Sequence, residues 1–201
     1  KKFVLFLLSA NLGEVGIVLI TLIAGLPLPL LPLQLLWINL VTDGLPALAL
    51  GVDNPEPHIM KRKPRGKHET ILTGQYSFMI TAGIISTIIV TGLFYYYLSA
   101  GVDIARTIAL TTLILFELFL AFSCRSKESA FTLKTNKWLW LAVVLSVIVH
   151  ISIMYTPLKN AFQLVPLSLM QWLIVIAASS TGLIFFEIKK GITDINHLRI
   201  Y

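Results

Sequence analysis

The chain has 201 residues, of which 56% are hydrophobic and 13% charged, and its mean hydropathy is +0.83. Soluble domains carry about 25% charged residues, so this composition excludes an ordinary globular domain and indicates a protein that crosses a membrane several times. The formal net charge of +6 could indicate nucleic-acid binding, but the distribution of the basic residues argues against it. The single cysteine, Cys124, excludes an intrachain disulfide and a metal site built from several cysteines.

The hydrophobic pattern predicts six membrane-spanning helices, because a helix needs about 20 mostly apolar residues to cross the hydrocarbon core of a bilayer. Glycine, proline and short polar stretches separate these segments, as expected for turns between helices. The fold is therefore expected to be an all-α, polytopic transmembrane bundle. In chain order, the six expected spans are residues 3–25, 33–50, 74–98, 105–124, 138–156 and 167–187.

The first span begins directly after two lysines, and the chain has no initiator methionine. A signal peptide could begin in the same way, but the apolar pattern continues past Glu14 to Leu26, which favours a full span over a cleaved leader. The missing methionine suggests that the chain is a segment of a longer protein.

The basic residues predict the orientation of the bundle. Fourteen of the 16 Lys and Arg residues fall on the same side as the N-terminus, and only Arg106 and Lys159 fall on the other side. By the positive-inside rule, both termini are expected in the cytoplasm. The loop 51–73 would then be a cytoplasmic coupling loop. Its basic cluster, 61–67, is explained by topology and lipid headgroups, so no nucleic-acid partner is expected.

Three of the ten acidic residues, Glu14, Asp43 and Glu117, lie near the middle of a predicted span, whereas the others fall in loops or at span ends. An acid at that depth costs about 2.5–3.5 kcal/mol on insertion scales. No Lys or Arg lies at mid-depth to neutralise the three carboxylates. They must be protonated, hydrated or bound to a metal, and their common depth on three helices predicts a shared cation site.

Polar neighbours extend this candidate site. Asn11 lies three residues before Glu14, and Asn39, Thr42 and Asp43 stand at positions i, i+3 and i+4, so each set shares one helical face. All these side chains offer oxygen, without histidine or cysteine, which disfavours zinc and copper and suits calcium, magnesium or manganese. No catalytic residue is expected in this chain. The candidate metal ligands are Asn11, Glu14, Asn39, Thr42, Asp43 and Glu117.

The second span contains a glycine and a proline that disturb a regular helix. Pro46 has no amide hydrogen to donate to the carbonyl of Thr42, and Gly44 allows the backbone to leave helical geometry cheaply. Irregular backbone at membrane depth is tolerated where it is buried in protein or lines a wet cavity. We therefore expect the second helix to be unwound near residues 44–46, next to the carboxylate of Asp43.

Three stretches of the chain are distinctive: NLGE at 11–14, PLQLLWINLVTDGLPA at 32–47 and DNPEPHIMKRKPR at 53–65. Together they resemble the P-type calcium ATPases of the sarcoplasmic-reticulum type. The resemblance is dense over residues 1–75, and over residues 76–201 it rests on the number of spans and on Phe116-Glu117-Leu118.

The resemblance implies that the six spans are the fifth to tenth helices of a ten-helix pump. It also implies a pair of adjacent calcium sites. One site would use Asn11, Glu14, Thr42, Asp43 and Glu117. Asn39 and Asp43 would contribute to the other, which the fourth helix of the pump completes.

By the same resemblance, the chain would be part of an ATP-driven translocase that moves Ca²⁺ out of the cytoplasm. ATP and Mg²⁺ would act in domains that this chain does not contain. Its partners would be helices one to four, the actuator, phosphorylation and nucleotide-binding domains, and the lipid bilayer. The loop between the third and fourth spans is short compared with that of the reticulum pumps. This resembles a bacterial member and favours the cell membrane over an organelle membrane.

Three alternatives follow from the same residues. A secondary divalent cation/proton exchanger needs the same carboxylates without ATP-driven domains. A P-type pump for another divalent cation, such as Mn²⁺, would use similar oxygen ligands. A purely structural module would use the polar groups for hydrogen bonds between helices. For a transporter, the repulsion among three carboxylates after the cation leaves predicts proton uptake by the site and hence proton counter-transport.

Overall fold

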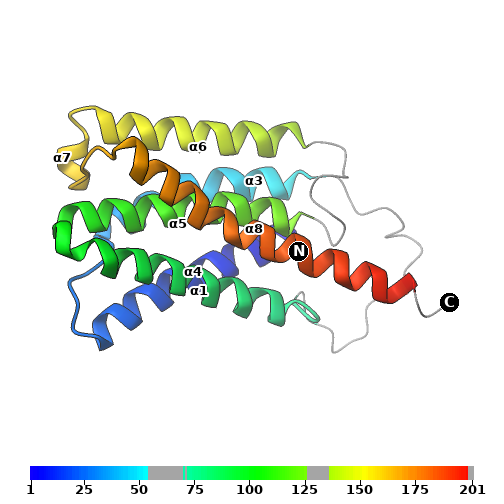
Figure 1. Ribbon diagram of the computed structural model, residues 1–201. Helices are drawn as coiled ribbons and strands as arrows, with labels where there is room; N and C mark the ends of the chain where they lie inside the picture. The colour runs from blue at the N-terminus through cyan, green and yellow to red at the C-terminus, as the bar shows by residue number, and fades with distance from the viewer. Residues whose placement is uncertain (54–69, 71, 126–135, 199–201) are drawn as a thin grey trace.

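The computed structural model describes residues 1–53, 70, 72–125 and 136–198, and the side chains of this range as far as residue 190. The described part contains six helical segments that are long and apolar enough to cross a membrane, as the sequence predicted. They lie side by side as a bundle (Figure 1). The segments are α1 (Lys2–Ile23), α2 to α3 (Pro32–Gly51), α4 with η3 (Tyr76–Ala100), α5 (Val102–Cys124), α6 (Lys137–Tyr155) and α8 (Leu169–Leu198).

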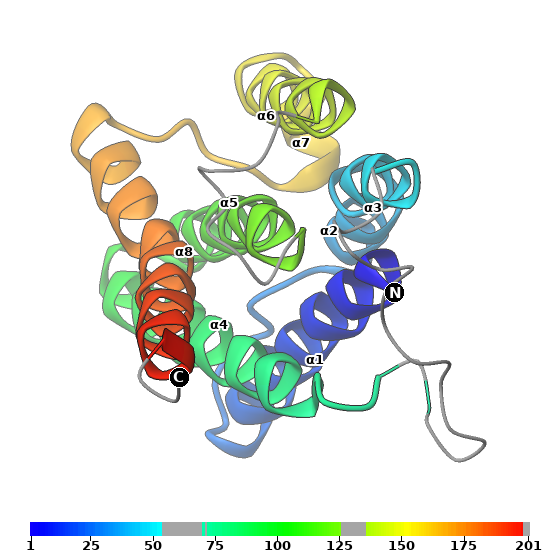
Figure 2. The ribbon, with the colours of Figure 1, turned by 90° about the vertical axis from the view of Figure 1, so that its right-hand side faces the viewer.

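Helix α5 forms the centre of the bundle. Seen along the bundle, the other long helices surround it (Figure 2). In its most apolar stretch, 89% of the residues are buried inside the protein, against 22–44% in the other five segments. A polar residue on α5 therefore faces protein and not lipid, which is the condition under which the acid Glu117 can be accommodated at this depth.

Helices α1 and α4 pack closely through small residues. A Cβ atom added at Gly16 of α1 would collide with the Thr87 side chain of α4, and one added at Gly83 of α4 would lie 2.8 Å from Cγ of Leu12. The Thr87 hydroxyl donates hydrogen bonds to the carbonyl of Gly83 (2.7 Å) and across the interface to that of Gly13 (3.4 Å). Close backbone approach through small residues is the usual way in which membrane helices associate, and here it fixes the helix that carries Glu14.

The second span is irregular, but at a different place from the one predicted. Helix α2 (Pro32–Trp37) passes into a π-helical turn, η1 (Ile38–Thr42), and helix α3 (Gly44–Gly51) follows. The amide of Asp43 donates to the carbonyl of Ile38 (2.9 Å), five residues earlier. The expected unwinding at residues 44–46 is therefore corrected: Pro46 lies in the first turn of α3, where a missing amide hydrogen is tolerated. The irregular backbone is instead the wide π-helical turn η1, which lies just before α3.

The segments that join the spans are anchored at one end of the bundle. Arg106 of α5 donates through Nε to the carbonyl of Leu28 (2.9 Å), and Gln34 donates to the carbonyl of Phe162 (2.8 Å), at the end of the short helix α7 (Lys159–Phe162). Trp37 packs edge-on against the Phe162 ring, with ring centroids 5.7 Å apart. These contacts fix the start of the α2–η1–α3 segment, which carries Asp43.

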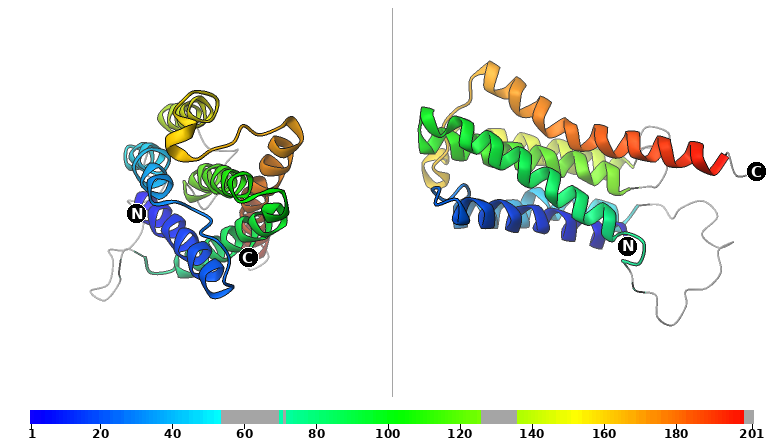
Figure 3. Two further views of the ribbon diagram at one scale, coloured as in Figure 1. Left: turned by 90° about the vertical axis from the view of Figure 1, so that its left-hand side faces the viewer. Right: turned by 60° about the horizontal axis from the view of Figure 1, so that its bottom comes forward.

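The start of α1 and the C-terminal end of α8 lie at the opposite end of the bundle, as the right-hand view of Figure 3 shows. The end of α3 and the start of α4 lie there as well. Most of the predicted coupling loop 51–73, including the whole basic cluster 61–67, lies outside the described residues. The cytoplasmic orientation of this end stays a prediction from the charge distribution.

The packing of α1 on α4 predicts that Gly16→Ala destabilises the full-length protein. The added methyl group meets the β-branched Thr87, which cannot rotate freely, and overpacking of this kind costs about 1–3 kcal/mol. Thermal unfolding in detergent measures the effect. The matched control is Gly92→Ala in α4, where no atom of the described residues lies within 4 Å of the added Cβ. Equal unfolding temperatures for the two variants would contradict this account of the interface.

Candidate cation-binding site

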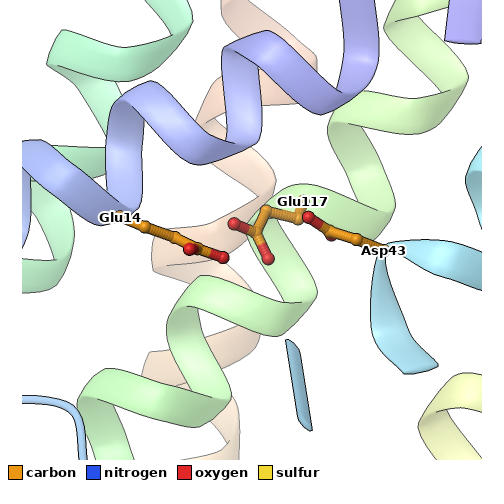
Figure 4. Close-up of side chains that lie close together, drawn as sticks. All are labelled: Glu14, Asp43 and Glu117. Carbon is orange, nitrogen blue, oxygen red and sulfur yellow. The ribbon is translucent and has the colours of Figure 1, made fainter. Parts of the chain in front are cut away.

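Three carboxylates from three separate helical segments meet inside the bundle. Glu14 comes from α1, Asp43 from the junction of η1 and α3, and Glu117 from α5, and they point towards one another (Figure 4). One carboxylate oxygen of each residue lies within 4.8 Å of the other two. The residues are only 6%, 0% and 1% exposed, respectively. The structure thus brings together the three acids that the sequence placed at mid-depth.

The π-helical turn orients the aspartate. The carbonyl of Ile38 accepts both the amide of Asp43 (2.9 Å) and the hydroxyl of Thr42 (3.1 Å). The two successive side chains, Thr42 and Asp43, are both fully buried. π-Helical turns inside helices occur frequently at functional sites. Here the turn places a hydroxyl oxygen beside a carboxylate on the inner side of the segment.

Hydrogen bonding satisfies only one of the three acids. The Asn39 amide nitrogen donates to both oxygens of Glu14, at 2.9 and 3.1 Å. Within the described residues, the four oxygens of Asp43 and Glu117 are buried, and no N–H or hydroxyl group donates to them. A buried acceptor without a partner costs about 1–3 kcal/mol, and more when it is charged. The cluster is therefore not balanced by the polar groups around it.

The electrostatic balance leads to the same conclusion. Two unit charges 4.8 Å apart repel by about 3.5 kcal/mol at an effective dielectric constant of 20. Three ionised acids make three such repelling pairs, whereas a hydrogen bond to a charged group stabilises the folded protein by only about 1.5–3 kcal/mol. The ion pairs of Arg106, Arg125 and Lys190 go to acids outside the cluster. Protons or a bound cation can supply the missing positive charge.

The other predicted ligands have different surroundings. Asn39 contacts Glu14 but is exposed, and its amide nitrogen, not its oxygen, faces that carboxylate. Half-buried Asn11 donates to the carbonyl of Leu7 on its own helix (2.8 Å). Thr42 gives its hydrogen to Ile38, so its oxygen lone pairs stay available to a cation. The structure joins Asn39 to the acids, and the roles of Asn11, Asn39 and Thr42 as ligands stay predictions.

Two buried polar features were not identified from the sequence. His150 of α6 lies with Nε2 3.1 Å from the Thr111 hydroxyl of α5, in a pair that links these helices. Asp53, expected in a loop, has a side chain only 3% exposed and pairs with Lys2 and Arg125. Local spacing gives no signal for either contact, because the partners come from distant parts of the chain.

The chain matches a known protein family and is similar to several proteins that carry a name. Residues 27–192 match the family described as "Cation transporting ATPase, C-terminus". The chain is 38% identical over 187 residues to a "Calcium-transporting ATPase" of Bacillus subtilis, covering 90% of this chain and 21% of that protein. It is 35% identical over 240 residues to a "Calcium-transporting ATPase" of Plasmodium falciparum, covering 94% and 20%.

A third relative is the "Calcium-transporting ATPase 1" of Bacillus cereus, which is 34% identical over 212 residues, covering 94% of this chain and 24% of that protein. The chain thus spans about a fifth to a quarter of the length of these relatives.

The unbalanced charge predicts that Glu117→Gln raises the unfolding temperature of the full-length protein in excess chelator at mildly alkaline pH. The change keeps the shape of the side chain and removes one of three mutually repelling charges, which stabilises by at least about 1 kcal/mol. Differential scanning fluorimetry in detergent measures the shift. As a control, Glu187→Gln removes the 2.9 Å ion pair with Lys190 outside the cluster and should not stabilise. A fall in the unfolding temperature of Glu117→Gln would contradict the charge argument.

Proposed function

The chain belongs to the cation-transporting ATPase C-terminal domain family, and on that premise we propose that it is the ion-binding membrane portion of an ATP-driven calcium pump. The observation that carries the proposal is the meeting of Glu14, Asp43 and Glu117, buried on three helical segments within 4.8 Å of one another. The relatives are named calcium-transporting ATPases, which supports calcium as the transported ion.

The geometry of the cluster suits calcium. Calcium binds 6–8 oxygens at about 2.3–2.6 Å, so two oxygens on opposite sides of the ion lie up to about 5 Å apart. One carboxylate oxygen from each acid, the three lying within 4.8 Å of one another, fits around one such ion. Further oxygens would come from Thr42, Asn11 and, after rotation of its amide, Asn39. In this proposal these residues, together with the three acids, are the ligands of the transported ion.

The rest of the pump would supply the energy. Because the chain spans only about a fifth of the relatives, ATP and Mg²⁺ would act in domains outside it, and helices one to four would complete the ion pathway. Asn39 supports this arrangement, since it is exposed although it contacts Glu14. A neighbouring helix of the complete pump would cover that side. The partners would thus be the actuator, phosphorylation and nucleotide-binding domains, the remaining helices and the bilayer.

The transport cycle would combine one adjustable segment with a fixed support. The α2–η1–α3 segment contains the wide turn beside Asp43, whereas α1 is held on α4 by close packing and α5 is enclosed on all sides. Displacement of Asp43 from the other two acids would open the site. The three carboxylates repel one another once calcium leaves, so they would take up protons, and the pump would exchange calcium for protons.

The orientation comes from the distribution of basic residues, and the direction of transport comes from the resemblance to the reticulum-type calcium pumps. Both termini would lie in the cytoplasm, by the positive-inside rule, and calcium would move out of it. The connection between α4 and α5 is short, formed by η3 (Leu98–Ala100) and Gly101. This supports a compact pump, which we place in the cell membrane in preference to an organelle membrane.

Removal of one carboxylate should weaken calcium-dependent phosphorylation of the full-length protein by ATP. For Glu14→Gln, Asp43→Asn and Glu117→Gln, the half-saturating calcium concentration should rise by at least about 10–100-fold, the range found even for groups that only support metal ligands. Phosphorylation with labelled ATP at buffered calcium concentrations measures it. Asp103→Asn, with a 65% exposed side chain at the other end of α5, is the control. Unchanged calcium dependence in all three variants would overturn the ligand assignment.

Vesicles that contain the full-length protein should take up labelled calcium when ATP is supplied and should move protons in the opposite direction. A trapped pH-sensitive dye follows the protons, and added Mn²⁺ tests the competing cation. Calcium uptake without any proton movement would contradict the exchange. Uptake driven by a pH gradient and indifferent to ATP would favour a cation/proton exchanger. Transport of Mn²⁺ in preference to calcium would identify a pump for that ion.

A further inference from the structure

A second polar cluster lies at the end of the bundle that carries the termini. The buried side chain of Asp53, two residues after the end of α3, accepts from Nζ of Lys2 at 2.6 Å, from Nε of Arg125 at 3.3 Å and from Nδ2 of Asn136 at 2.9 Å. Asn136 also donates to the carbonyl of Ala49 in α3 (3.0 Å). We call Asp53, Lys2, Arg125 and Asn136 the Asp53 cluster.

The members of the Asp53 cluster come from the ends of four helices. Lys2 begins α1, Asp53 follows α3, and Arg125 directly follows α5. Asn136 caps α6, where its side-chain oxygen accepts from the amides of Trp138 (3.0 Å) and Leu139 (3.2 Å). A single carboxylate thus ties α3 to three neighbouring helices.

Three of these four helices are the ones that carry the carboxylates of the cation site. Along the chain, Lys2 is 12 residues from Glu14, Asp53 is 10 residues from Asp43, and Arg125 is 8 residues from Glu117. At 1.5 Å per residue these separations correspond to about 18, 15 and 12 Å. The same three helices therefore meet twice, once at the cation site and once at Asp53.

Two meeting points have a mechanical consequence. Helices that touch at one point can slide or tilt about it, whereas helices that are joined at two points along their length have a fixed axial register. The first meeting point consists of like charges that push the helices apart. The second consists of opposite charges and hydrogen bonds that hold them together. The Asp53 cluster therefore opposes the repulsion among the three site carboxylates.

We propose that Asp53 is a positioning residue for the cation site: by joining the ends of α1, α3 and α5, it sets the distances among Glu14, Asp43 and Glu117. This inference rests on the proposed function. It assigns to Asp53 no contact with the transported ion. Partners that orient metal ligands without touching the metal typically change metal affinity by 10–100-fold when they are removed.

A positioning role differs from a merely structural role in what it changes. If Asp53 served stability alone, its loss would lower the unfolding temperature and the yield, but the molecules that fold would bind calcium as tightly as before. If Asp53 positions the site, the folded molecules bind calcium more weakly. The dissociation constant of the folded fraction therefore separates the two roles.

The experiment measures equilibrium binding of labelled calcium to the purified full-length protein without ATP, together with its unfolding temperature. Asp53→Asn keeps the size of the side chain and removes the charge, so we expect the dissociation constant to rise about tenfold. Arg125→Gln should have a similar effect, and Arg125→Lys should recover most of the affinity because it keeps the positive charge. Asp103→Asn, which removes an ion pair within α5 at the far end, should stay within about twofold of the wild type.

If Asp53→Asn does not fold, Lys2→Gln provides the test of the positioning role. The Lys2 side chain is 21% exposed and forms one arm of the cluster, so the variant should fold and bind calcium several-fold more weakly than the wild type. Wild-type affinity in Asp53→Asn would overturn the inference, as would wild-type affinity in Lys2→Gln if only that variant folds. Absence of calcium binding by the wild type would instead overturn the proposed function, and this inference with it.

Discussion

The structure depends on the charge balance of three buried carboxylates. Glu14, Asp43 and Glu117 meet in the protein interior, and Asn39 is the donor that reaches one of them in the described part of the chain. Their mutual repulsion exceeds the stabilisation from the Asn39 hydrogen bonds. The three acids therefore stay together only when positive charge is bound or when the surrounding helices hold them in place. Both requirements suit the proposed function, in which the site binds a cation and later releases it.

The surrounding architecture meets the second requirement with ordinary packing and hydrogen bonding. Helix α5 is enclosed by its neighbours, and α1 approaches α4 through Gly13, Gly16 and Gly83. The segment with Asp43 is the exception, because its helix contains a π-helical turn at the level of the site. The most irregular backbone in the described spans thus lies beside Asp43, one of the three acids of the proposed cation site, where a change of helix geometry would alter the acid cluster most directly.

The family membership and the geometry support each other. The family match covers most of the chain, from residue 27 to residue 192, and the relatives extend far beyond it. In the proposed function, the contribution of this membrane portion would be a site whose affinity responds to movement. The proposed positioning by Asp53 extends this view. A bond at the end of the bundle, next to the connection between α3 and α4, would influence a site that lies about 15 Å away along α3.

The sequence by itself determined the six spans and the identity of the three acids. Hydropathy fixes which segments can cross a bilayer, and no basic residue at mid-depth can neutralise Glu14, Asp43 and Glu117, so their importance follows from electrostatics alone. Only the tertiary structure decided the rest. The break in the second span moved from residues 44–46 to the turn before them, because a proline in a first helical turn needs no compensation. The bonds of Asp53 reach partners 51, 72 and 83 residues away, and such contacts depend on how the helices pack and not on any local pattern.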